Sequence, residues 1–193
     1  MEPVPEAAGA PRGLQEVPDW RAQGVEVGRS PVDEERLDRA RRVLLKAEAK
    51  GVRIVLPKDH VVVSEVAADA KGRVLGNGHV PTDEFCVDIG PATVAEFAEH
   101  IERAGTALWS GPMGVYEHDA FAHGTVQFAQ AVARARSSVV IGGDTTLALR
   151  KAGVVPFVTH LSTGGGAALE LLEGKELPGL EALRQSRRSS DAP

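Results

Sequence analysis

The sequence is short of several residue and segment types, and each shortage excludes a class of protein. Its 193 residues include a single cysteine, Cys86, so neither an internal disulfide nor a multi-cysteine metal site is available. No stretch approaches the roughly 20 consecutive apolar residues of a membrane-spanning helix, and the acidic, proline-rich start differs from a signal peptide. We therefore expect a cytoplasmic protein with no membrane partner.

Positive charge and catalytic motifs are scarce as well. The 22 Lys and Arg residues are outnumbered by 27 Asp and Glu residues, which leaves a net charge of −5 and no broad positive field for a nucleic acid partner. No histidine pair has zinc-ligand spacing, and neither a G-x-x-x-x-G-K-[ST] loop nor a G-x-S-x-G elbow occurs. These absences argue against zinc sites, P-loop nucleotide hydrolases and α/β-hydrolases. Cys86 lies in the apolar run FCVDI, where a buried thiol is the usual outcome and a reactive thiol the alternative.

The middle of the chain alternates apolar runs with amphipathic stretches. The spacing predicts a helix from residue 32 to Gly51, followed by two β-branched runs, VRIVL (52–56) and VVVSEV (61–66). From FCVDI (85–89) onward each apolar run precedes a predicted helix, the first two over residues 91–105 and 120–135. This alternation is typical of a parallel sheet covered on both faces. We predict an α/β fold with a Rossmann-like, three-layer parallel sheet.

The two ends of the chain lack this pattern. Residues 1–21 contain four prolines and no apolar periodicity, and residues 184–193 are equally polar. We expect a disordered extension over 1–21, a folded domain over 22–183 and a disordered tail over 184–193.

Three glycine-containing turns follow predicted strands, at the positions where open parallel sheets bind ligands. In the third turn, Gly164, Gly165 and Gly166 precede the helical stretch AALELLEG. Exposed backbone N–H groups and the helix dipole predict an anion site there, and a hinge or a tight turn without a ligand is the alternative.

The other two turns add carboxylates. In Gly142-Gly143-Asp144-Thr145, the Asp144 side chain either caps a helix or approaches Mg²⁺ bound to a polyphosphate. The turn from Ser110 to Val115 is an apolar wall, and Glu117 beyond it either accepts ribose hydroxyls or is a solvated surface residue. Together the three turns predict a site for a purine nucleoside polyphosphate.

Seven segments of the chain resemble the C-terminal, nucleotide-binding domain of phosphoglycerate kinase. They are GVEVGRS (24–30), VRIVLPKD (52–59), VDIGPATV (87–94), LWSGPMGVYE (108–117), FAHGT (121–125), IGGDTT (141–146) and HLSTGGGAALELLEGKELPGLEAL (160–183).

The resemblance implies phosphoryl transfer between ATP and 3-phosphoglycerate, a step of glycolysis, with Mg²⁺ and ATP or ADP as cofactors. It assigns the phosphoryl group in transfer to Gly164, Gly165 and Gly166, and the metal to Asp144. The residues implied to contact the nucleotide are Val87, Ser110, Pro112, Gly114, Val115, Glu117, Gly142, Gly143, Asp144 and Thr145.

Four positions depart from the family pattern. The family has a small apolar residue at Lys58, Asn at Ser110, Phe at Tyr116 and Gly at Ile141. Because a hydroxyl lacks the two-sided hydrogen bonding of an amide, we expect a weakened nucleotide contact at Ser110.

The resemblance does not extend to two parts of the family's chain. The acceptor domain, which binds 3-phosphoglycerate, and the first part of the nucleotide domain have no counterpart, so two central strands would be missing and an unpaired parallel edge is expected. We expect a truncated phosphoglycerate kinase that is inactive alone. The alternative is a non-catalytic adenine-nucleotide-binding or interaction module that pairs with another chain supplying the missing strands or acceptor domain.

Overall fold

The computed structural model describes residues 21–183, except residues 31, 33, 68 and 77–78. The predictions for the extension and the tail therefore lie outside the described residues, apart from Arg21, which is helical. Among the described residues, no helix is both long and apolar enough to cross a membrane.

The first long helix forms where the sequence predicts it. Helix α2 (Glu34–Ala49) has acidic residues in its first turn and Lys46 in its last, which suits the helix dipole. Gly51 follows with a φ of 64°, a conformation that glycine adopts without strain. The prediction of this helix is confirmed.

The strand predicted over residues 52–56 is wrong. These residues form no strand, and Val52 and Ile54 are 58% and 37% exposed. An apolar β-branched run becomes a strand only where a neighbouring strand accepts its hydrogen bonds and its side chains are covered. No described strand lies beside this run.

The six described strands form two separate sheets. The first has the order β2-β1-β3, with β1 (Asp59–Val63) antiparallel to both β2 (Arg73–Gly76) and β3 (Phe85–Ile89). Cys86, on β3, is 1% exposed and packs with Val27, Val62 and Val80, as a structural thiol would. The sequence analysis predicted that FCVDI, which forms β3, belongs to the parallel sheet; that placement is wrong, because β3 pairs antiparallel with β1 in a sheet that was not predicted.

The second sheet is the predicted parallel one, and the α/β fold is confirmed. Its order is β4 (Ala107–Ser110), β5 (Ser138–Ile141), β6 (His160–Ser162), with Trp109 opposite Val140 and Val140 opposite Leu161. Strand β4 is an edge of this sheet. The unpaired parallel edge expected from the missing strands is therefore present among the described residues.

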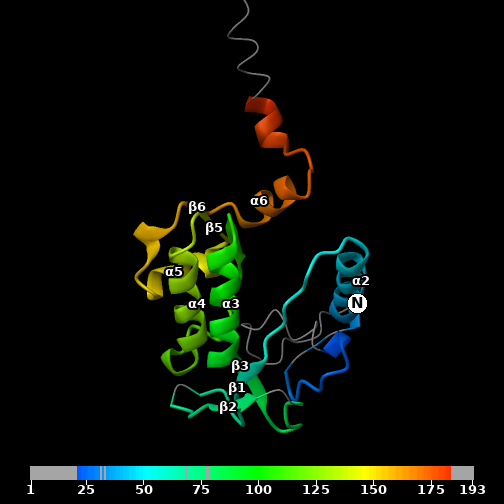
Figure 1. The fold of residues 1–193 in the computed structure, drawn as a ribbon, viewed down its shortest axis with the longest axis vertical. Helices are drawn as coiled ribbons and strands as arrows, with labels where there is room; N and C mark the ends of the chain where they lie inside the picture. Colours follow the sequence, from blue (N-terminus) through cyan, green and yellow to red (C-terminus); the bar gives the residue numbers. More distant parts are fainter. Residues whose placement is uncertain (1–20, 31, 33, 68, 77–78, 184–193) are drawn as a thin grey trace, which may run out of the picture.

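Helices cover one face of the parallel sheet. Figure 1 shows α3 (Pro91–Arg103), α4 (His123–Ala133) and α5 (Gly143–Lys151) standing side by side as a layer. A short 3-10 helix, η1 (Asp119–Phe121), precedes α4, and a second, η2 (Val155–Phe157), precedes β6. The core of this layer is apolar and tightly packed, and its buried residues include Ile101, Trp109, Ala129, Val132, Val140 and Leu149.

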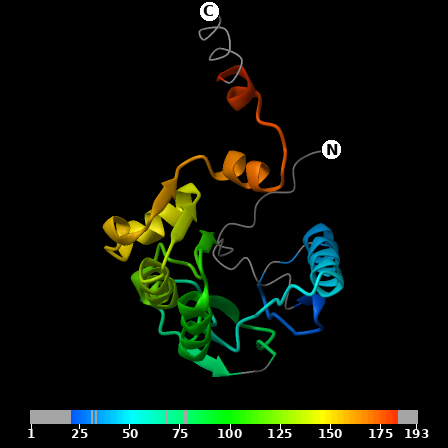
Figure 2. The same ribbon diagram turned by 45° about the horizontal axis from the view of Figure 1, so that its top comes forward.

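The last helices lie outside that layer. Helix α6 (Gly165–Leu172) and the helical segment 178–183 extend away from α3, α4 and α5 (Figures 1 and 2). No residue of α6 is buried. The carboxyl edge of the parallel sheet is thus bounded by well-packed helices on one side and by an exposed helix on the other.

Candidate functional site

The three glycine-containing turns lie side by side at one edge of the parallel sheet. They follow the ends of β4 at Ser110, β5 at Ile141 and β6 at Ser162. Because adjacent parallel strands end at the same edge, the turns after them become neighbours. The sequence placed all three turns after strands, and the strand order brings them together.

Hydrogen bonds join each turn to the next. The backbone N–H of Gly111 donates to Thr145 Oγ1 over 2.7 Å, which ties the first turn to the second. The N–H of Gly142 donates to the Ser162 carbonyl over 3.3 Å, which ties the second turn to the strand that leads into the third. A Cβ atom added to Gly165 would lie 3.4 Å from Gly142 Cα, so the second and third turns are in contact.

The second turn presents a helix start with a carboxylate beside it. Gly142 precedes α5 with a φ of 103°, and no side chain caps this helix. Asp144, in the first helical turn, and Gly143 are exposed, whereas Thr145 is 2% exposed. The first N–H groups of a helix have no partner within the helix and carry partial positive charge, so this turn suits an anion with a metal beside it.

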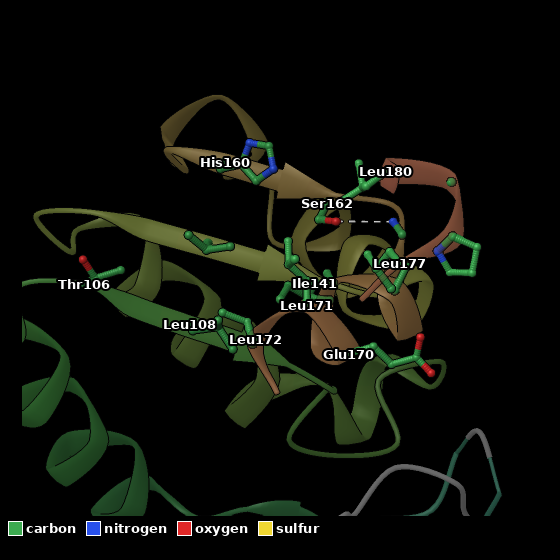
Figure 3. A pocket seen from close by; sticks show the side chains of 16 residues that line it. Thr106, Leu108, Ile141, His160, Ser162, Glu170, Leu171, Leu172, Leu177 and Leu180 are labelled. Atoms are coloured by element: carbon green, nitrogen blue, oxygen red, sulfur yellow. Dashed lines mark hydrogen bonds between the residues drawn. The ribbon is translucent and has the colours of Figure 1, made fainter. Parts of the chain in front are cut away.

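The third turn presents a second helix start without an acidic residue in its first turn. Gly164 precedes α6, and its N–H donates to Ser162 Oγ over 3.3 Å (Figure 3). Gly164 and Gly166 are exposed, and Gly165 is half-buried. Backbone N–H groups at such a start can approach an anion closely because glycine has no side chain in the way.

The first turn forms an apolar wall. Pro112, Gly114 and Val115 are buried, while Ser110 and Glu117 at its two ends are exposed. The indole Nε1 of Trp109 donates to the Gly111 carbonyl and so holds the start of the turn.

Val87 supports this wall from the other sheet. Its carbonyl accepts the N–H of Val115 over 2.8 Å. Its side chain is 0% exposed and packs with Val63, Val115 and Phe121. Val87 therefore lies beneath the wall and presents no side chain to a ligand.

A buried carboxylate, Asp88, sits behind the same wall. Asp88 is 1% exposed. Its carboxylate accepts a hydrogen bond from the N–H of Gly124 over 2.6 Å and another from the N–H of Ile89, the next residue in the chain, over 3.0 Å. Burial raises the pKa of Asp88 to about 7, although these N–H donors oppose the rise. A Cβ on Gly114 or Gly124 would collide with this carboxylate, so both positions require glycine.

Tyr116 and Lys151 connect the wall to helix α5, and the sequence analysis assigned neither to the site. Lys151 Nζ donates to the Tyr116 carbonyl over 2.6 Å and pairs with Asp119 over 2.6 Å. Burial, and then the carboxylates of Asp144 and Glu117, raise the pKa of Tyr116, and a side-chain hydrogen bond to Asp144 adds to the effect. The residues in these contacts are 28 to 35 positions apart in the sequence, so no local sequence pattern predicts them.

Asp144 is the acidic side chain in the first turn of α5 that could meet a metal ion. Among the described residues, no group of three or more His, Cys, Asp or Glu side chains could hold a metal. Mg²⁺ commonly takes one or two carboxylates and completes its shell with phosphate oxygens and water. Asp144, exposed beside the start of α5, provides one such carboxylate.

Comparison with known proteins identifies the family of this chain. A sequence profile described as phosphoglycerate kinase matches residues 19–175. The chain belongs to the phosphoglycerate kinase family. Among curated relatives, the phosphoglycerate kinases of Chlorobium chlorochromatii and Geotalea daltonii are 49% and 46% identical to it over 168 residues, 85% and 86% of this chain.

Solved structures of the phosphoglycerate kinase family agree. The enzyme from Coxiella burnetii matches with a TM-score of 0.84 and 42% identity over 90% of this chain, and that from Pyrococcus horikoshii with 0.73 and 30% over the same share. This chain covers 45% and 44% of those two chains, and 42% of each of the two curated relatives. It therefore spans less than half the length of the family members it matches.

Proposed function

We propose that this chain binds Mg²⁺ with ATP or ADP across its three turns, as the nucleotide-binding part of a phosphoglycerate kinase. The observation that carries the proposal is the chain of contacts that joins the turns, from Gly111 to Thr145 and from Gly142 to Ser162. These contacts align two uncapped helix starts beside an apolar wall, the arrangement that a nucleoside with several phosphates requires.

Each turn has its own role in this proposal. The wall, with Pro112, Gly114 and Val115, contacts the nucleoside, and Ser110 and Glu117 offer polar atoms at its exposed ends. The Gly142-Gly143 turn contacts phosphate, with Thr145 fixing it against the wall and Asp144 meeting the metal. The start of α6, at Gly164, Gly165 and Gly166, receives the phosphoryl group in transfer.

Phosphoryl transfer itself needs more than these turns. Catalysis in this reaction depends almost entirely on positioning and on electrostatic stabilisation of the moving group. The family places the acceptor, 3-phosphoglycerate, on a domain to which none of the seven matching segments belongs. We therefore expect this chain to bind nucleotide but to show no turnover alone in a coupled assay with ATP and 3-phosphoglycerate.

Calorimetry with Mg-ADP tests the binding proposal directly. We expect saturable binding by the unaltered chain, and an affinity at least 10-fold weaker in Asp144→Ala, because that variant removes the only acidic side chain in the first turn of α5. Asp83→Ala is the matched control, since Asp83 is also exposed but precedes β3 in the other sheet, outside the three turns. Absence of binding by the unaltered chain would overturn the proposal, as would equal losses in both variants.

A second candidate function is association with another chain, and a specific surface favours it. Edge strand β4 lacks a partner strand on one side among the described residues, and the side chains of Leu108, Val52 and Ile54 are exposed. A groove of about 830 Å³ lies between the parallel sheet and the chain from α6 to residue 180 (Figure 3). The residues that line it include five leucines, Leu108, Leu171, Leu172, Leu177 and Leu180.

The two candidates differ in the mass of the chain in solution. A stand-alone nucleotide-binding unit keeps the 20.4 kDa of one chain, whereas a unit that needs the missing strands associates with a partner or with itself.

A further inference from the structure

A short arch, residues 117–120, leads from the end of the wall to Phe121. The residues before the arch, Val115 and Tyr116, are 5% and 8% exposed, and Phe121 after it is 0% exposed. Glu117, the first residue of the arch, is exposed. The core therefore fixes both ends of the arch, whereas its course between them depends on contacts with neighbouring elements.

Lys151, at the end of α5, contacts the chain on both sides of Glu117. Its Nζ donates to the carbonyl of Tyr116 over 2.6 Å and pairs with the carboxylate of Asp119, also over 2.6 Å. Tyr116 directly precedes Glu117, and Asp119 lies just beyond it. An ammonium group carries three donors, so it can make both contacts at once. Lys151 thus bridges the stretch of chain that carries Glu117.

The two contacts of Lys151 differ in strength. The side chain of Asp119 is 95% exposed, and an ion pair in water is weak because the solvent screens it. The side chain of Lys151 is 28% exposed and its bond to the Tyr116 carbonyl is partly buried, so water competes less for this bond. A charged donor strengthens it further. The carbonyl contact therefore holds the backbone, and the ion pair restrains the arch beyond it.

Helix α5 supports the wall at both of its ends. At the start of the wall, the N–H of Gly111 donates to Thr145 Oγ1 over 2.7 Å, and at its end the Tyr116 carbonyl accepts Lys151 Nζ. The two contact points on α5 lie about 9 Å apart along its axis. Leu149, between them, is 0% exposed and anchors α5 in the core. Groups held in this way lose little freedom when a ligand binds.

We propose that Lys151 is a positioning residue, which bridges the chain on either side of Glu117 and thereby orients that carboxylate toward the ribose hydroxyls of the bound nucleotide. This inference rests on the proposed function. A carboxylate on an unrestrained arch would sample many positions, and few of them would meet a ribose. The competing explanation is that Lys151 only stabilises the fold, in which case the affinities for all nucleotides would change alike.

The substitution Lys151→Met removes the ammonium and keeps an apolar stem, and two nucleotides separate the explanations. Calorimetry compares ADP with 2′,3′-dideoxy-ADP, each with Mg²⁺, since only ADP offers ribose hydroxyls. We expect the unaltered chain to prefer ADP by about 10-fold, the effect of a hydrogen bond to a charged group, and Lys151→Met to prefer it by about 3-fold or less. Arg150→Met removes a neighbouring cation from the last turn of α5 and should keep the full preference.

The outcomes distinguish this inference from the proposed function. Equal losses of affinity for both nucleotides in Lys151→Met, an unchanged preference, or an unaltered chain that binds both equally would overturn the inference and leave Mg-ADP binding standing. Absence of any binding would overturn both. In Glu117→Ala the preference should be lost, and adding Lys151→Met should not change it further. A further change would mean that Lys151 does not act through Glu117.

Hydrogen exchange tests the restraint without a nucleotide. The N–H of His118 donates to the Val115 carbonyl over 3.2 Å, and the N–H of Phe121 donates to the His118 carbonyl over 3.0 Å, so both groups report the order of the arch. We expect them to exchange about 5-fold faster in Lys151→Met than in the unaltered chain or in Arg150→Met, because the arch opens more often. Equal exchange in all three proteins would overturn the inference.

Discussion

At the scale of single residues, Asp88 links the buried interior to the wall of the proposed site. Its carboxylate caps the start of α4 through Gly124 and fills the space behind Gly114. Burial raises its pKa from an ordinary 3.8 to about 7. The folded chain therefore holds a proton on Asp88 between these two values, where the unfolded chain does not, and this contribution to stability is lost as pH rises through 7.

Asp88→Asn should abolish that pH dependence. Relative to the variant, we expect the unaltered chain to lose on the order of 2–4 kcal/mol of unfolding free energy between pH 5 and pH 8, because each unit of pKa shift is worth about 1.4 kcal/mol. His60, whose pKa burial lowers to about 4, contributes the opposite slope below its ordinary pKa of 6.5, but it does so in both proteins and cancels in the difference. Urea unfolding at several pH values measures this difference in unfolding free energy between the unaltered chain and the variant. A constant difference would show that Asp88 titrates near its ordinary value.

The sequence predicted the position of the site residues that lie directly after a strand. The glycine pair, Asp144 and the glycine triplet are adjacent in sequence to the strand ends that position them, so their place at the sheet edge was predictable. Tyr116 was not, since its partners are 28 and 35 residues away and one of its contacts uses a carbonyl. Val87 was predicted to be near the pocket, but its side chain is enclosed by the core.

At the scale of elements, the turn from β5 into α5 requires glycine at one position and tolerates a side chain at the next. Gly142 has a φ of 103°, and an added Cβ would lie 3.4 Å from Thr145 Oγ1. We expect Gly142→Ala to reduce the unfolding free energy by about 1–3 kcal/mol, the cost of holding an ordinary residue in a backbone conformation that favours glycine. Gly143→Ala is the control: no atom lies within 4 Å of its Cβ position, and alanine favours helix by up to about 1 kcal/mol. Urea unfolding of both variants measures the two free energies of unfolding. Equal reductions in Gly142→Ala and Gly143→Ala would contradict the prediction.

Elements that pack on their own sequence neighbours were predictable, and those that need distant partners were not. The prediction of a helix over 91–105 matches α3 closely, and FCVDI forms β3 over the predicted residues. The predicted helix over 120–135 is split into η1 and α4. The run 52–56 has the composition of a strand but lies beside none, since strand formation depends on a neighbour that the run itself does not encode.

At the scale of the whole molecule, exposed apolar surface is the main property that the sequence could only suggest. Leu171 and Leu172, on α6, are 50% and 63% exposed, and Leu108 on edge strand β4 is 47% exposed. Composition does not reveal such a surface, because it depends on which neighbours cover which face. The missing strands of the resemblance indicated the open edge, and the structure locates it at β4.

We expect this surface to cause concentration-dependent self-association when no other partner is present. Light scattering should give a mass above 20.4 kDa for the unaltered chain. Leu171→Lys should reduce that mass, whereas Leu147→Lys should not, because Leu147 is equally exposed at 50% but lies on α5 outside the groove. A mass of one chain at every concentration, or the same effect from both variants, would contradict this account.

The indole of Trp109 gives the proposed site an optical reporter of its own. Its ring is 2% exposed and meets Phe128 edge to face, while its Nε1 donates to the Gly111 carbonyl at the start of the wall. The chain has only two tryptophans, so replacing Trp20 with Phe would leave Trp109 as the only tryptophan, which can be excited apart from Tyr116. Occupancy of the turns could then be followed as a change in emission, without labelling the chain or the nucleotide.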